Sequence, residues 1–197
     1  MSCTGNNEKL NKKSIGIWKY DKHSDDLKLI ATAIAALAGE IWREHYTPII
    51  GAEQVDYMLE KYQSAERIFE DIIRGEFVYY TATGNHNLGT NGGNGANNIN
   101  GLIGYCACQP QKCYLLLSKL YVQKDNRGRG VARGFLEEAI ALCRNEFGFD
   151  KIRLTVNKYN DGSIAVYRKM GFTKIDSVKT DIGGGYFMDD YVMELCV

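Results

Sequence analysis

The sequence lacks any surplus of charge. Its 197 residues carry 24 Lys and Arg against 24 Asp and Glu, so the formal net charge is zero and the pI is about 6.8. A basic surplus would favour nucleic acid or an anionic membrane, and an acidic surplus would favour polycations. We therefore expect neither nucleic acid nor a membrane surface as a partner.

Long apolar runs are also missing. No segment approaches the roughly 18 apolar residues that a membrane span requires. The opening MSCTGNNEK contains no apolar core of a secretory signal. We expect a disordered leader over residues 1–13 and one domain over residues 14–197 of a cytoplasmic protein, because this length suits a single core.

Metal-ligand spacing is absent as well. Cys106 and Cys108 share a strand face, but Cys113 is not followed by a fourth ligand at zinc-type spacing. Without a secretory signal, the six cysteines do not indicate a disulfide framework. We predict reduced thiols and no metal.

The sequence does contain a strand, a glycine loop and a helix in direct succession. The apolar run 116–122 predicts a strand, and Arg127-Gly-Arg-Gly130 leads into a helix with apolar residues at 3.6-residue spacing. The first N–H groups of a helix lack partners and carry partial positive charge. Glycines let a phosphate approach the backbone closely. This stretch predicts a pyrophosphate site.

Residue types separate the known phosphate loops. A P-loop ends in Gly-Lys-Ser/Thr, whereas this loop ends in Gly-Val-Ala. The dinucleotide fingerprint requires glycine at position 133, where Arg133 stands. The remaining pattern, Arg127-x-x-Gly130-x-Ala132, resembles the R/Q-x-x-G-x-G/A signature of the GNAT superfamily of acyl-CoA-dependent N-acyltransferases. The alternative is a solvated Gly-Arg turn before an ordinary helix.

A second motif supports the same resemblance. Residues 160–172 resemble the GNAT pattern N-x-x-A-x-x-x-Y-x-K-x-G-F, with Ser163 in place of alanine. The resemblance extends from about Ser14 to the C-terminus and implies an α/β (α+β) fold. That fold has a mixed central sheet of about seven strands, a splayed strand pair and flanking helices. In this family a bulge near the end of the fourth strand separates it from the fifth.

Apolar periodicity and turn residues predict the element order. We expect Ser24 to cap the first helix and Pro48 to interrupt the chain after it. Residues 84–101 are almost entirely Asn and Gly and predict a flexible hairpin loop. The expected strands are 14–20, 77–82, 101–108, 114–122, 151–156, 173–179 and 186–196, and the expected helices are 24–45, 53–61, 64–75, 130–148 and 163–170.

The resemblance implies acetyl-CoA as co-substrate. Backbone of the fourth strand would pair with its pantetheine arm, loop N–H groups would bind its diphosphate, and arginines could reach phosphates. A backbone N–H near Leu120 would stabilise the thioester oxygen. The residues expected at the cofactor are Leu120, Tyr121, Val122, Arg127, Gly128, Arg129, Gly130, Val131, Ala132, Asn157, Asn160, Ser163 and Tyr167.

Tyr167 is the predicted general acid for the departing thiolate. A phenol of pKa ~10 stays protonated at neutral pH and can donate to a thiolate, whose acid has a pKa of ~8.5. Spacing places Tyr167 and Asn160 on one helix face. The general base stays open among Glu40, His45, Tyr46, Asp190 and a water chain.

The acceptor is expected between the first helices and the final hairpin. Residues 181–194 resemble GNAT members related to the diamine and polyamine acetyltransferases, so a small primary amine is predicted. Amino acids, aminoglycosides, protein N-terminal amines and a non-catalytic acyl-CoA sensor are the alternatives. The family commonly forms homodimers, and the final hairpin could serve this. The residues predicted at the acceptor are Trp42, Tyr46, Ser118, Tyr186 and Asp190, with Tyr57 and Phe187 as further aromatic candidates and Glu53, Asp181 and Asp189 as further carboxylates.

Overall fold

A computed structural model describes residues 15–84 and 101–197 of the chain. The expected leader 1–13 and the interior of the expected Asn/Gly loop 84–101 lie outside the described residues. None of the described helices is both long and apolar enough to cross a membrane.

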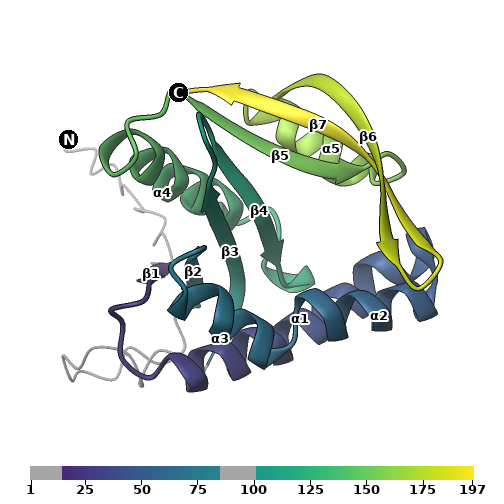
Figure 1. The fold of residues 1–197 in the computed structure, drawn as a ribbon, viewed down its shortest axis with the longest axis horizontal. Coiled ribbons are helices and arrows are strands. Elements are labelled where there is room, and N and C mark those ends of the chain that lie inside the picture. Colours follow the sequence, from purple (N-terminus) through teal and green to yellow (C-terminus); the bar gives the residue numbers. More distant parts are fainter. Residues whose placement is uncertain (1–14, 85–100) are drawn as a thin grey trace, which may run out of the picture.

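Seven strands form one mixed sheet in the order β1-β2-β3-β4-β5-β7-β6 (Figure 1). Within the sheet only β4 and β5 pair in parallel, and this confirms the expected crossover through a helix. The sheet and its flanking helices confirm the predicted fold class. The strands are β1 (Gly16–Tyr20), β2 (Val78–Thr83), β3 (Leu102–Pro110), β4 (Leu115–Val122), β5 (Lys151–Asn157), β6 (Thr173–Gly183) and β7 (Tyr186–Cys196).

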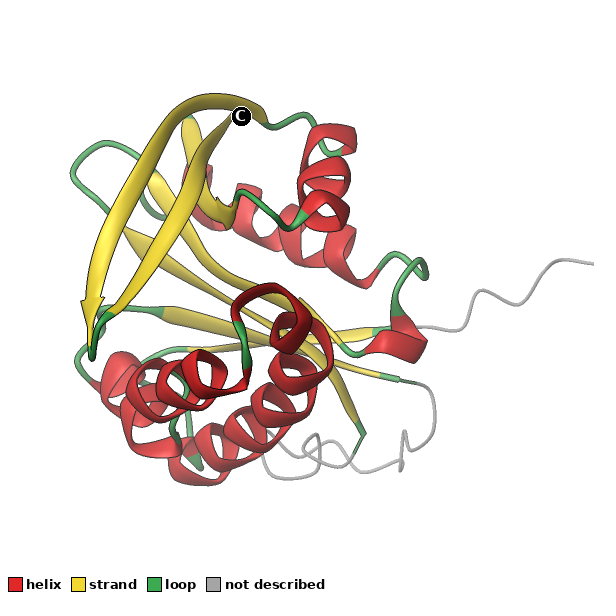
Figure 2. Cartoon of the chain, turned by 90° about the vertical axis from the view of Figure 1, so that its right-hand side faces the viewer, coloured by secondary structure: helices red, strands yellow, loops and turns green. Residues whose placement is uncertain are grey.

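Helices cover both faces of the sheet, as Figure 2 shows. One set packs with a buried cluster around Ile34, Ile68 and Tyr105, and the other packs with a cluster around Phe135, Ile152 and Phe172. The first set comprises α1 (Leu27–Ile50), α2 (Ala52–Tyr62) and α3 (Ala65–Ile73), and the second comprises α4 (Val131–Asn145) and α5 (Asp161–Lys169).

The first helix differs from its prediction at both ends. Ser24 was expected as the N-cap, but its hydroxyl accepts from the Asp21 N–H at 3.0 Å and the helix begins after Asp26, at φ 54°. The expected end near His45 was also wrong, because α1 continues through Pro48 to Ile50. Proline in a last turn removes only one helical hydrogen bond, so the helix tolerates it there.

A bulge on β4 opens the sheet at its centre. Ala107 pairs with Lys119 but Cys108 pairs with Leu117, so Ser118 is an extra residue on β4. A bulge bends its strand and increases the twist. β4 and β5 pair only at Leu115–Ile152 and at the next residue pair, and then diverge (Figure 1). The expected splay is present, with the bulge in mid-strand rather than near the strand end.

The β6–β7 hairpin reaches back to α2. The carbonyl of Ile182 accepts from the Tyr57 hydroxyl at 2.6 Å and from Lys61 Nζ at 2.6 Å. Gln54 Nε2 donates to the carbonyl of Phe187 at 3.0 Å. These bonds hold the hairpin tip against the first helices, so the hairpin forms a wall on one side of the opened sheet.

Candidate active site

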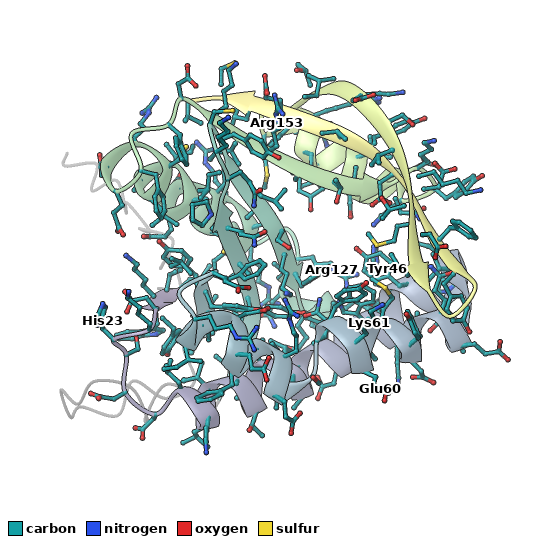
Figure 3. All side chains as sticks on the ribbon, in the orientation of Figure 1. His23, Tyr46, Glu60, Lys61, Arg127 and Arg153 are labelled. Atoms are coloured by element: carbon teal, nitrogen blue, oxygen red, sulfur yellow. The ribbon has the colours of Figure 1, made fainter. Side chains whose placement is uncertain are left out.

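A cavity of about 490 Å³ opens where β4 leaves β5. It lies between the end of β4, the loop before α4, α5 and the C-terminal half of α1. In Figure 3 Tyr46 and Arg127 lie near each other beside the end of β4, and both line this cavity. Its lining consists of Ile41, His45, Tyr46, Leu120, Tyr121, Val122, Asn126, Arg127, Gly128, Gly130, Val131, Ala132, Arg133, Gly162, Ser163, Val166, Tyr167 and Met170.

The glycine loop forms one end of this cavity. Gly128 has φ 74° and Gly130 has φ 90°, a backbone region that side chains rarely adopt. A Cβ added at either glycine would meet no atom within 4 Å, so the space beside the backbone is open. Among the described residues, no acceptor bonds to the N–H groups of Gly128, Arg129 and Gly130. With the α4 N-terminus, these groups can hold an anion.

The two loop arginines differ in position. The Nε of Arg127 donates to the Val122 carbonyl at 3.0 Å, and its Nη2 donates to Glu44 Oε2 at 2.6 Å. The Arg127 hydrogen bond is the main cause that lowers the pKa of Glu44. Arg127 therefore joins the end of β4 to α1 at the cavity wall. Arg129 is exposed and lies outside the lining.

The second motif places Tyr167 in the cavity. Burial raises the pKa of Tyr167, with a further contribution from Tyr46, so the phenol keeps its proton at neutral pH. Asn160 has a different position from the one expected. It caps α5 by accepting from the Ser163 N–H at 3.2 Å, and its Oδ1 also lies 3.2 Å from His45 Nε2. Asn160 is 2% exposed and does not line the cavity.

A second cavity of about 80 Å³ lies between helices α1 and α2 and strands β4, β5 and β7. Tyr46 and Tyr121 line both cavities, with ring centroids 6.3 Å apart. The two spaces therefore meet at this tyrosine pair. The lining of the second cavity consists of Trp42, Tyr46, Ile50, Gln54, Met58, Ser118, Tyr121, Thr155, Val156, Asn157, Met188 and Asp190.

Asp190 is the charged residue of the second cavity. Its side chain is 3% exposed, and its Oδ1 has no hydrogen-bond partner among the described residues. Burial raises the pKa of Asp190 to about 6; neighbouring Asp189 adds to this, while Lys158 and Thr155 oppose it. At neutral pH this carboxylate is mostly ionised and can accept a proton. Asp189 itself forms an ion pair with Lys158.

The other base candidates are less well placed. Burial raises the pKa of Tyr46 to about 12, so it stays protonated at neutral pH. Burial and the charge of Arg127 lower the pKa of His45, which lines the larger cavity as a neutral imidazole. Glu40 is exposed, accepts from Gln123 Nε2 at 3.4 Å, and lines neither cavity.

Two further expected residues also differ in position. Tyr186 was expected at the acceptor, but its ring packs on Tyr57 at 5.1 Å between centroids and lies outside the second cavity. Asn157 was expected at the cofactor but lines the second cavity, opposite Asp190 in the β5–β7 register. Sequence reasoning missed the apolar wall residues Ile41, Val166 and Met170, because helical spacing does not distinguish a cavity wall from a core.

The described residues contain no cluster of side chains suited to bind a metal ion. Within residues 15–84 and 101–197, no group of three or more His, Cys, Asp or Glu side chains could hold a metal ion. Of the cysteines in the described part, Cys106, Cys108 and Cys143 are buried free thiols, and Cys113 and Cys196 are exposed free thiols.

Similarity to known proteins agrees with this geometry. An L-amino acid N-acetyltransferase, AaaT of Escherichia coli K12, is 32% identical over 87 residues, which cover 43% of this chain and 53% of the relative. The match thus spans about half the length of that relative.

Solved structures share the fold. A PaiA N-acetyltransferase from Thermoplasma acidophilum, in complex with coenzyme A, has a TM-score of 0.70 at 22% identity and covers 93% of this chain and 99% of that chain. Arabidopsis thaliana NAA60, in complex with a bisubstrate analogue, has a TM-score of 0.58 at 15% identity, with 93% and 99% covered.

The family model described as the acetyltransferase (GNAT) family matches residues 40–172, about two thirds of the chain. This range contains both sequence motifs and every lining residue of the larger cavity. The chain belongs to the acetyltransferase (GNAT) family.

Proposed function

We propose that this enzyme transfers the acetyl group of acetyl-CoA directly to the primary amine of a small molecule. The larger cavity would hold the cofactor and the smaller cavity the amine. One observation carries this assignment: the two cavities share Tyr46 and Tyr121 at the point where β4 separates from β5. A thioester at that junction would have the amine on one side and its own leaving group on the other.

The larger cavity suits acetyl-CoA in shape and chemistry. The loop N–H groups around Gly128 and Gly130 would bind the diphosphate, as open backbone at a helix N-terminus favours an anion. The unpaired edge of β4 beyond Leu116 would bond the pantetheine amides like an added strand. Arg127 and Arg133 supply positive charge at the rim.

The reacting groups would divide the proton transfers. Asp190 takes a proton from the ammonium, and the neutral amine attacks the thioester carbon. The new C–N bond forms as the C–S bond breaks, and Tyr167 protonates the thiolate. A backbone N–H near Leu120 stabilises the oxyanion of the tetrahedral intermediate. No covalent enzyme intermediate is required.

Two acceptor classes have support from different observations. Residues 181–194 resemble the segment of GNAT members related to the diamine and polyamine acetyltransferases, which favours a diamine or polyamine. The 32% identity to an L-amino acid N-acetyltransferase favours an amino acid. A non-catalytic acyl-CoA sensor would need neither a buried phenol at the cofactor nor a buried carboxylate at the junction, so Tyr167 and Asp190 favour catalysis.

Release of free thiol from acetyl-CoA, with and without an amine panel, tests the reaction. We expect release that depends on one amine class. Tyr167→Phe should lower kcat by tenfold or more while calorimetry still detects CoA binding. Tyr159→Phe is the matched control, because Tyr159 is 74% exposed and outside both cavities. Unchanged kcat in Tyr167→Phe would refute its role as general acid.

A further inference from the structure

We infer that the acceptor is an apolar monoamine that carries no carboxylate, and that Asp190 selects it. This inference rests on the proposed function, because it narrows the acceptor of the same site. It excludes free amino acids as good substrates. It also predicts a lower kcat/KM for polyamines than for monoamines of similar length. Charge, shape and an unpartnered atom of the second cavity each support it.

The charge of the second cavity has one sign. Among its described lining residues, Asp190 is the only one with a charged side chain. The two lysines adjacent in sequence to lining residues are engaged elsewhere: Lys119 Nζ lies 3.6 Å from Asp71 Oδ2, and Lys158 pairs with Asp189. An amino acid's carboxylate would be buried near a like charge, and the described lining offers it no cation and no arginine fork. The charge of Lys158 also acts on Asp190, but Lys158 is already paired with Asp189. The site therefore disfavours such a carboxylate.

Hydrogen bonding in the cavity favours one ammonium. Asp190 Oδ1 is buried without a partner among the described residues, and an ammonium N–H would satisfy it. Once Asp190 is used, the described lining offers no second carboxylate for a second ammonium. The second charge of a diamine would lose hydration without an ion-pair partner.

The remaining walls are apolar and aromatic. The Trp42 ring lies 4.5 Å from the Tyr46 ring and 5.6 Å from the Tyr121 ring, measured between centroids. Met58 and Met188 also line the cavity. Burying a hydrocarbon chain against such walls is favourable, because it removes apolar surface from water. The flexible methionine side chains can adapt to the shape of the chain. A cavity of about 80 Å³ suits a short chain.

Acceptors that differ by a single group test this inference on the full chain. The first set is 3-methylbutylamine, leucine and leucine methyl ester, which share one skeleton and differ in the carboxylate. The second pair is butylamine and putrescine, which differ in the second ammonium. Each kcat/KM is measured at pH 8 by thiol release.

We expect kcat/KM for 3-methylbutylamine to exceed that for leucine by about 100-fold, because the bound leucine carboxylate would be a buried charge without a partner. The kcat/KM for leucine methyl ester should be at least tenfold higher than that for leucine. The kcat/KM for butylamine should be about tenfold higher than that for putrescine. Leucine equal to or better than 3-methylbutylamine would overturn the inference, as would putrescine above butylamine. No thiol release with any amine would instead contradict the proposed function.

Asp190→Asn tests the selecting residue. With 3-methylbutylamine it should lower kcat/KM by 100-fold or more, while CoA affinity measured by calorimetry stays within threefold. Retained CoA binding shows that the variant is folded. Undiminished kcat/KM in this variant would show that another group holds the amine.

Discussion

Two buried carboxylates of this protein have opposite surroundings. Asp71 on α3 is 2% exposed, and its Oδ2 accepts from the Tyr79 hydroxyl at 3.2 Å and lies 3.6 Å from Lys119 Nζ. Arg67 Nε lies 2.7 Å from the Asp71 Oδ1 and forms an ion pair with it, but the angles do not make this contact a hydrogen bond. Asp190 on β7 is 3% exposed and lies beside a cavity, and its Oδ1 has no hydrogen-bond partner in residues 15–84 and 101–197.

This difference separates a structural charge from a charge available to a ligand. Lys119 lies at the β4 bulge, and burial lowers its pKa to about 8 even though Asp71 opposes the shift. Its ammonium also lies over the rings of Phe77 and Tyr79. Asp71 and Lys119 thus neutralise each other inside the fold. Asp190 forms no ion pair among the described residues, and Lys158, whose charge acts on it, is paired with Asp189, so a bound amine can provide the missing counter-charge.

The largest expected effect is on the paired carboxylate. Asp71→Ala should lower the free energy of unfolding by about 3–5 kcal/mol, because it leaves the Lys119 ammonium buried without its counter-charge. Urea unfolding at pH 7 measures this. A loss below about 1 kcal/mol would mean that Asp71 does not neutralise Lys119.

A double substitution isolates the charge from the packing. The double variant Asp71→Leu with Lys119→Met should be more stable than Asp71→Ala, with a free energy of unfolding at least about 2 kcal/mol higher. The reason is that both buried charges are removed together. The same urea measurement applies, with Lys119→Met alone as the companion variant. If the double variant is as unstable as Asp71→Ala, shape rather than charge sets the cost.

The unpaired carboxylate should behave in the opposite way. Asp190→Asn should leave the free energy of unfolding at pH 7 unchanged or raise it by up to about 2 kcal/mol, because it removes a buried, unpaired charge. Burial raises the pKa of Asp190 from 3.8 to about 6, so the folded state favours the protonated carboxyl. Any gain should therefore shrink as the pH falls from about 6 towards 4. A loss above 1 kcal/mol at pH 7 would identify Asp190 as structural.

Turnover should show the same pKa. If ionised Asp190 accepts the amine proton, kcat/KM falls about tenfold per pH unit below about pH 6, where the carboxyl is protonated. Initial rates of thiol release between pH 5 and pH 9 measure this acidic limb. The residual activity of Asp190→Asn should lack it, and a wild-type profile flat down to pH 5 would contradict the role of Asp190 as base.

The smallest effect is expected at the exposed partner of Asp71. The Arg67 side chain is 42% exposed, so solvent screens its ion pair. Arg67→Ala should lower the free energy of unfolding by about 1 kcal/mol or less, since Lys119 and Tyr79 remain. A loss comparable to that of Asp71→Ala would make Arg67 the main partner.

Local patterns in the sequence determined the elements and the glycine loop at one end of the larger cavity. Alternating apolar residues and helical spacing depend on near neighbours, so each described strand and α-helix was predicted, apart from some boundaries. The short 3-10 helix Lys124–Asn126 was not predicted. The loop from Gly128 to Gly130 is a local device as well, because a positive φ and a following helix need only adjacent residues. Tyr167 followed from a motif confined to one helix.

Only the tertiary structure decided which distant residues meet. The family resemblance, and no local pattern, led us to expect Trp42, Ser118 and Asp190 in one site; the structure joins them in one cavity and places Tyr186 outside it. It also paired Lys119 with Asp71, residues that no spacing rule relates. Whether a carboxylate is paired depends on packing between separate elements. A sequence pattern carries no information about the distance between that carboxylate and a cation on another element.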